Sequence, residues 1–163
     1  MEERFTLDHA KNVIFRYLSY RARSEEEVKR HLSRKGFSEA VVETALEWAR
    51  EYRLLDDSEF AARWVENRRL LKPMGKRRIA YELREKGIPE AIVDSNLAGF
   101  SAEEEYRLAC SLVEGRLNRA TRPVAPEKLI SWLLRRGFPL QLCYQVVREL
   151  ANNPHWAGKL LNS

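Results

Sequence analysis

The feature that most constrains this chain is an internal threefold repeat. Residues 28–37, 79–88 and 129–138 share one pattern: an apolar residue, a leucine four positions later, and then a basic residue, a glycine and a final aromatic residue or isoleucine. The glycines stand at positions 36, 87 and 137, so the repeat length is 51 and then 50 residues. The agreement continues through the apolar positions that follow each glycine. A self-similar period of this length is typical of proteins built as a row of similar units.

Each repeat predicts three helices and no strand. The apolar residues of the shared pattern mark a short helix, and the glycine supplies the left-handed residue that ends it. Ser38, Pro89 and Pro139 follow the glycines and begin a second helix, because serine caps helices and proline is tolerated in a first turn. A longer amphipathic helix precedes each pair. No segment alternates with a period of two, so we expect an all-α fold of about nine helices without a β-sheet.

The repeat also predicts how the chain is divided. A unit of about 50 residues is marginally stable alone, and stacking against a neighbour supplies the missing burial. We therefore expect an elongated, curved, solenoid-like array whose long face binds an extended partner. The predicted boundaries are residues 1–54, 55–100 and 101–151 for the three repeats, with a C-terminal tail at 152–163. That tail contains Pro154 and Trp156, and it either docks on the last repeat or moves freely.

The positive charge is concentrated in one stretch. The chain carries a formal net charge of +5, whereas residues 63–86 alone hold nine basic and three acidic residues. Between residues 68 and 78 no acidic residue interrupts six basic ones, so we expect no ion pairs within this run. A solvated helix face is the plain alternative, but concentrated charge favours an anionic partner. The predicted contact residues are Arg68, Arg69, Lys72, Lys76, Arg77, Arg78 and Arg84, with Arg21, Arg23, Arg34 and Lys35 as an extension weakened by the neighbouring acidic run 25–27.

Catalytic and metal-binding patterns are missing from the sequence. The acidic runs 25–27 and 103–105 each follow a serine at a predicted helix start, where the helix dipole favours carboxylates. The three histidines lack metal-ligand spacing, and Gly75-Lys76 has neither the glycine-rich loop nor the Ser or Thr of a phosphate-binding loop. We expect no enzyme activity, no metal and no cofactor.

The remaining polar and aromatic features have structural interpretations. Cys110 and Cys143 lie on apolar helical stripes and are expected to be buried, reduced thiols. Trp64 is expected to pack against other helices rather than to stack on nucleobases, while Trp48 and Trp132 stay undecided. No signal-like or membrane-spanning apolar run is visible, which favours a cytoplasmic protein, and a monomer is the simplest expectation.

Several motifs in order resemble the RecX family of bacterial recombination regulators. They are Tyr-Leu-Ser-Tyr-Arg-Ala-Arg-Ser-Glu-Glu-Glu at 17–27, Lys-Gly-Phe at 35–37, Leu-Asp-Asp-Ser-Glu-Phe-Ala at 55–61 and Gly-Lys-Arg-Arg-Ile-Ala-Tyr-Glu-Leu-Arg-Glu-Lys-Gly-Ile at 75–88. The resemblance covers roughly residues 10 to 150 and is strongest in the first two repeats. One departure is Lys76, which stands where members of the family commonly have proline; it leaves the helix entry less rigid and adds a charge.

The resemblance implies a function without covalent chemistry. Such proteins bind filaments of RecA on single-stranded DNA in the helical groove of the filament, inhibit ATP turnover and strand exchange, and limit filament growth. They thereby act as negative regulators of recombination and the SOS response. A second hypothesis is a stand-alone DNA-binding module that uses one helix of a repeat as a groove reader without RecA.

Overall fold

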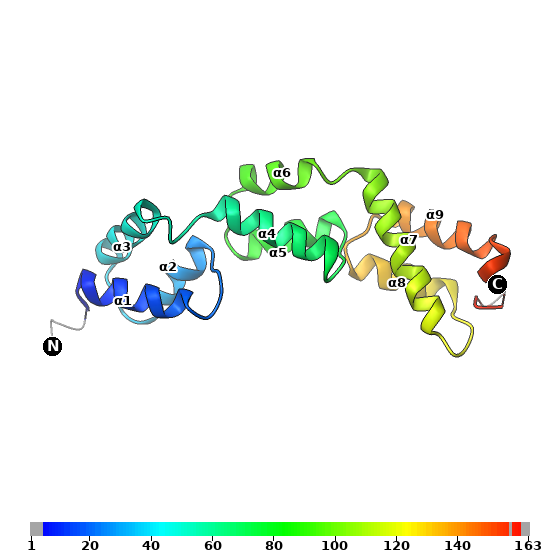
Figure 1. Cartoon of the computed structure of the whole chain (residues 1–163), viewed down its shortest axis with the longest axis horizontal. Helices are drawn as coiled ribbons and strands as arrows, with labels where there is room; N and C mark the ends of the chain where they lie inside the picture. The colour runs from blue at the N-terminus through cyan, green and yellow to red at the C-terminus, as the bar shows by residue number, and fades with distance from the viewer. Residues whose placement is uncertain (1–4, 157, 161–163) are drawn as a thin grey trace. The chain divides into compact units, whose positions relative to one another are not determined.

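The computed structural model describes residues 5–156 and 158–160 (Figure 1). Within these residues the chain forms only α-helices and one short 3-10 helix, η2, and contains no strand beyond a single bridge between Val124 and Leu160. The helices are α1 (Leu7–Leu18), α2 (Glu25–Arg34), α3 (Glu39–Glu51), α4 (Asp57–Leu70), α5 (Lys76–Glu85), α6 (Glu90–Ala98), α7 (Ala102–Arg119), α8 (Pro126–Arg135), α9 (Leu140–Ala151) and η2 (Pro154–Trp156). The predicted all-α class is therefore confirmed, with three successive helix triads. None of the described helices has the length and apolar character needed to cross a bilayer.

The apolar positions of the repeated pattern contribute to the buried cores of the first and third triads. In the first triad Ile14, Leu32 and Leu46, one from each helix, belong to one buried cluster. In the third triad Leu133 and Val147 occupy the matching positions of a second cluster. Removing these side chains from water is the main force that holds three short helices together.

The described residues group into two compact units. The first contains the chain up to Arg63 together with Leu83–Asn96, and the second contains Trp64–Glu82 and the chain from Leu97 onward. The boundary passes through α4 and α5, so the middle triad contributes to both units. As a result, each unit holds one junction between neighbouring triads.

The two junctions are built in the same way. In the first unit the hydroxyl of Ser24, which caps α2, donates to the carbonyl oxygen of Lys86 at 2.6 Å. In the second unit the backbone N–H of Gly75, just before α5, donates to the carbonyl oxygen of Arg136 at 2.7 Å. Lys86 and Arg136 each directly precede a repeat glycine. The start of the second helix in one triad is thus joined to the end of the second helix in the next.

The glycines of the repeat serve both the turn and the junction. Gly36, Gly87 and Gly137 have φ values of 93°, 73° and 86°, the left-handed conformation predicted for them. A Cβ atom on Gly87 would lie 2.3 Å from the Cβ of Glu26, and one on Gly137 would lie 2.4 Å from the backbone nitrogen of Arg78. A glycine at these two positions therefore also allows neighbouring triads to approach closely.

The described part of the C-terminal tail docks on the third triad. Trp156 and Leu160 are 5% and 8% exposed and belong to the same buried cluster as α7, α8 and α9. The N–H of Val124 donates to the carbonyl oxygen of Lys159 at 2.9 Å, and the Lys159 ammonium donates to the carbonyl oxygen of Ala120. Of the two arrangements left open by the sequence, the docked one is therefore observed for residues 152–156 and 158–160.

Candidate functional site

The basic run lies at the end of α4, in the following loop and at the start of α5. Arg68 and Arg69 are in the last turn of α4, Lys72 is in the loop, and Lys76, Arg77 and Arg78 open α5. These six residues all belong to the second compact unit. Arg84 lies in the first unit, where its guanidinium forms a two-pronged pair with Glu90, with Nε 2.8 Å from the carboxylate. The structure thus brings together six of the seven predicted residues.

Two arginines of the run share one carboxylate. Glu82 accepts from Arg68 Nε at 2.6 Å, from Arg78 Nε at 3.1 Å and from the indole N–H of Trp64 at 2.9 Å. Burial raises the pKa of Glu82, but the hydrogen bonds from Arg68, Trp64 and Arg78 outweigh it and hold the pKa below its ordinary value. The Arg68 guanidinium, from the same helix, also lies over Trp64, 4.6 Å from the ring centre.

A third arginine pairs with the third triad. Arg69 donates to Glu104 of α7 at 2.7 Å, and its guanidinium lies over the ring of Phe100. The expectation of no ion pairs within the run holds for the described residues, but Arg68, Arg69 and Arg78 are nevertheless paired with carboxylates from outside it. The partners, Glu82 and Glu104, are brought to the run by folding.

Three residues of the run stay available for a partner. Lys72 and Arg77 are exposed, and neither has a carboxylate within ion-pair distance among the residues that the structure describes. Lys76 is half-buried, with its ammonium 5.8 Å from the Phe100 ring. Its backbone N–H donates to the carboxylate of Glu105 at 2.8 Å. This buried carboxylate therefore accepts from a backbone N–H at the start of α5 that has no acceptor within the helix.

The third triad adds three arginines that the sequence analysis did not select. Arg116, Arg119 and Arg136 line a groove of about 460 Å³ together with Trp132, and no carboxylate lines it. The guanidinium groups of Arg116 and Arg136 lie 4.8 and 4.6 Å from the Trp132 ring centre. Burial and then the charge of Arg116 lower the pKa of Arg136, as expected for cations gathered without a counter-ion.

This arginine groove adjoins the loop of the basic run. Arg136 donates to the carbonyl oxygen of Pro73 at 2.9 Å, next to Lys72 in sequence. The sequence signals were the pairing of Arg116 with Arg119 one turn apart and the basic position before Gly137. These signals are weak in the sequence, because the basic residues of the third repeat are spread among acidic ones and Arg136 also fits a helix end, where a cation complements the dipole.

The predicted extension lies in the first unit. Arg21 pairs with Glu27 at 2.7 Å, and Arg23 lies 4.0 Å from the same carboxylate and 4.1 Å from the Tyr17 ring centre. Arg34 donates to a backbone carbonyl of its own helix, and Lys35 lines a groove between α1 and α2. Arg21 and Arg23 are thus engaged by the acidic run that follows them.

The other polar candidates have structural surroundings. The described residues hold no cluster of three or more His, Cys, Asp or Glu side chains that could bind a metal ion. Cys143 is buried, which raises the pKa of its thiol to about 11 and makes it a poor nucleophile at neutral pH. Cys110 was also expected to be buried but is only half-buried.

Comparisons with known proteins agree on one family. The family models described as the first and second three-helix domains of RecX match residues 10–48 and 56–97. A regulatory protein RecX from Mycolicibacterium smegmatis is 37% identical, covering 89% of this chain and 81% of the relative, and one from Amycolatopsis mediterranei is 34% identical, covering 91% and 85%. A crystal structure of RecX from Lactobacillus salivarius shares the fold, with a TM-score of 0.75 at 22% identity over 88% of this chain and 95% of that one. A second crystal structure, of a regulatory protein RecX, has a TM-score of 0.74 at 28% identity. This chain belongs to the RecX family of regulatory proteins.

Proposed function

We propose that this protein binds the RecA–single-stranded DNA filament in its groove and inhibits RecA ATP turnover, strand exchange and filament growth. It would thereby restrain homologous recombination and the SOS response, acting in the cytoplasm as a monomer without a cofactor and without covalent chemistry of its own. Membership of the RecX family is the observation that carries the choice of partner.

The cations of the second unit support an anionic partner. Lys72, Lys76 and Arg77 are proposed to contact the filament directly, joined by the arginine groove of Arg116, Arg119 and Arg136. Arg68, Arg69 and Arg78 stay within the proposed surface, but their ion pairs give them the additional task of holding α4, α5 and α7 together. Arg84 is proposed to contribute less to filament binding, because Glu90 already neutralises its charge.

A RecA ATPase assay on single-stranded DNA tests this function. We expect added wild-type protein to lower ATP turnover and the double variant Lys72→Glu/Arg77→Glu to inhibit at least tenfold less strongly, because two attractive contacts become repulsive. Both side chains are exposed, so helical content measured by circular dichroism should be unchanged. The matched control is Lys128→Glu/Arg148→Glu, which changes the net charge equally at exposed positions outside the run and the arginine groove.

Two results would contradict the proposal at different levels. If wild-type protein leaves ATP turnover unchanged, the proposed function is wrong. If the Lys72/Arg77 variant and the control inhibit equally well, the filament contact lies elsewhere.

A stand-alone DNA-binding module remains the second candidate, favoured by the arginine groove that no carboxylate lines. A duplex binder making about six phosphate contacts should lose affinity with a log–log salt slope near −5 and should need no RecA. Titrating duplex DNA over a range of salt concentrations, with and without RecA, separates the two. Weak binding to naked duplex together with strong inhibition of RecA would exclude this second candidate.

A further inference from the structure

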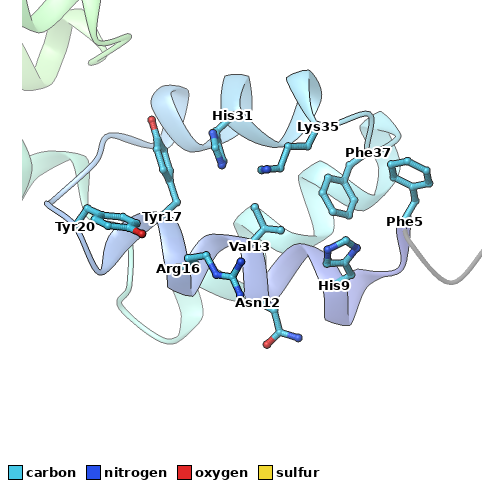
Figure 2. Close-up of a pocket in the computed structure, with 10 residues that line it drawn as sticks. All are labelled: Phe5, His9, Asn12, Val13, Arg16, Tyr17, Tyr20, His31, Lys35 and Phe37. Carbon is cyan, nitrogen blue, oxygen red and sulfur yellow. The ribbon is translucent and has the colours of Figure 1, made fainter.

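A groove of about 490 Å³ lies between α1 and α2 in the first triad, entirely within the first compact unit (Figure 2). Val13 lies at its floor, between the walls formed by α1 and by α2. Its volume is within the range of sites that hold small molecules or single residues of a polymer. The proposed filament surface of the second unit does not include it.

Aromatic rings stand at both ends of this groove. At one end Tyr17 and His31 are stacked, with ring centres 3.9 Å apart and planes inclined by 3°. Tyr20 lies beyond them with 77% of its surface exposed. At the other end Phe5 and Phe37 meet edge to face at 5.7 Å. Because Tyr17 is stacked by His31 and lies 4.1 Å from the Arg23 guanidinium, and because Phe37 is buried, Tyr20 and Phe5 are the exposed rings of the two ends. Exposed planar side chains are surfaces on which nucleobases stack.

Cationic groups lie between the aromatic ends. Arg16 of α1 and Lys35, at the end of α2, both line the groove, and Figure 2 shows Lys35 extending toward the space between the helices. No acidic side chain lines the groove, and neither cation has a carboxylate partner among the described residues. Burial, followed by the charges of Lys35, Arg34 and Arg23, lowers the pKa of His31, so its imidazole is neutral at pH 7 and serves as a ring rather than a charge.

We propose that this groove binds a short segment of single-stranded nucleic acid. Its phosphates lie between Arg16 and Lys35, and its bases lie against the rings at the two ends, with Tyr20 as the exposed stacking surface. The order of aromatic, cationic and aromatic groups along the groove matches the alternation of base and phosphate along a single strand. In a duplex the base faces are covered by their neighbours, so the rings would find no partner.

Two other occupants fit the groove less well. An apolar peptide would cover Arg16 and Lys35 without supplying a counter-charge, which is costly for buried cations. A purely acidic peptide would neutralise the cations but leave Tyr20 and Phe5 exposed to water, at 77% and 45%. A single strand satisfies both kinds of group.

The experiment is a titration of the full-length protein with a short, fluorescently labelled oligothymidylate, followed by anisotropy without RecA. Loss of one stacking contact should raise the Kd of Tyr20→Ala about tenfold, while Tyr20→Phe, which keeps the ring, should bind like wild type. Arg16→Ala/Lys35→Ala should flatten the log–log salt dependence by about 0.7 for each cation removed.

Matched controls separate the groove from general effects of charge and ring removal. Tyr52→Ala removes another exposed ring of the first triad, and Lys128→Ala/Arg148→Ala removes two exposed cations outside the groove. Both controls should bind like wild type. An oligomer of abasic residues of equal charge should bind about tenfold more weakly than oligothymidylate, because it lacks bases to stack.

Three outcomes would overturn the assignment: unchanged affinity of Tyr20→Ala, equal affinity for the abasic oligomer, or competition by polyglutamate as strong as by oligothymidylate. The proposal does not rest on the proposed function, since RecA is absent from the titration. Loss of RecA inhibition in Lys72→Glu/Arg77→Glu and loss of oligonucleotide binding in Tyr20→Ala are separate results, so either idea can fail alone.

Discussion

At the scale of single residues, Glu82 shows how a run of like charges in the sequence becomes a set of paired charges in the fold. One carboxylate that is 12% exposed accepts hydrogen bonds from Arg68, Arg78 and Trp64. Such charge-assisted bonds are stronger than neutral ones, and their geometry holds the end of α4 against α5. Lys72 and Arg77 lie beside this network without joining it. Burial and pairing, rather than charge density, therefore select the residues that can meet a partner.

We expect Glu82→Gln to reduce the free energy of unfolding by about 2 kcal/mol at pH 7, because two arginines lose their charged acceptor. The pKa of Glu82 is lowered in the folded state, so its contribution is fully present above the unfolded-state pKa of about 4.3 and disappears as the pH falls through the folded-state pKa. Urea unfolding of wild type and variant between pH 7 and pH 3 measures this difference. A constant gap across that range would show that the ionised form of Glu82 is not what stabilises the fold.

At the scale of the helical elements, the repeat glycines end a helix at all three positions and also lie at a junction between triads at two of them. Each repeat glycine ends a helix in the left-handed conformation. Gly87 and Gly137 also lie against the first turn of the second helix in the preceding triad, whereas a Cβ on Gly36 would meet, among the described residues, the side chain of Phe5 at 3.2 Å. No triad is described before the first repeat, so the role of Gly36 is to end its helix.

This difference predicts unequal effects of one substitution. Gly36→Ala should cost about 1–2 kcal/mol, the price of placing a Cβ in the left-handed region. Gly137→Ala should cost at least about 2 kcal/mol more, because its Cβ would meet the backbone of Arg78 and force the junction apart. Unfolding midpoints in urea compare the two variants directly. Equal losses would mean that the junction between the second and third triads yields easily.

At the scale of the whole molecule, the first and third triads each have a buried core, and the middle triad contributes to both compact units. The third triad carries an additional element, because η2 and Leu160 cover its apolar cluster. In a protein of stacked repeats, stability is approximately a sum of unit and junction terms. A defect in one unit should therefore stay local.

Trp156→Ala tests this locality. Removal of a buried tryptophan typically costs about 3–5 kcal/mol, and Trp156 is 5% exposed. Amide hydrogen exchange should show lost protection in α8 and α9 but little change in α2. Tyr144→Ala removes an exposed ring of α9 and serves as the control. Equal loss of protection in α2 would indicate that the chain unfolds as one cooperative body.

Much of the fold could be read from local patterns. The repeat period, the helices, the left-handed glycines and the helix caps at Ser24 and Ser101 depend on residues a few positions apart, and all are present in the structure. The family also follows from motifs in order along the chain. These features are encoded locally because helix periodicity and turn chemistry act over single turns.

The proposed binding surfaces could be identified only from the tertiary structure. Arg69 finds Glu104 and Arg136 reaches Pro73 across long sequence separations, and the α1–α2 groove gathers its rings and cations from two helices. Whether a charge is neutralised, and whether an apolar tail is covered, depends on which distant groups folding brings within a few ångströms. Hydrogen bonds and ion pairs form between groups that are close in space, however far apart those groups lie in the sequence. The order of residues along the chain therefore could not identify the partners.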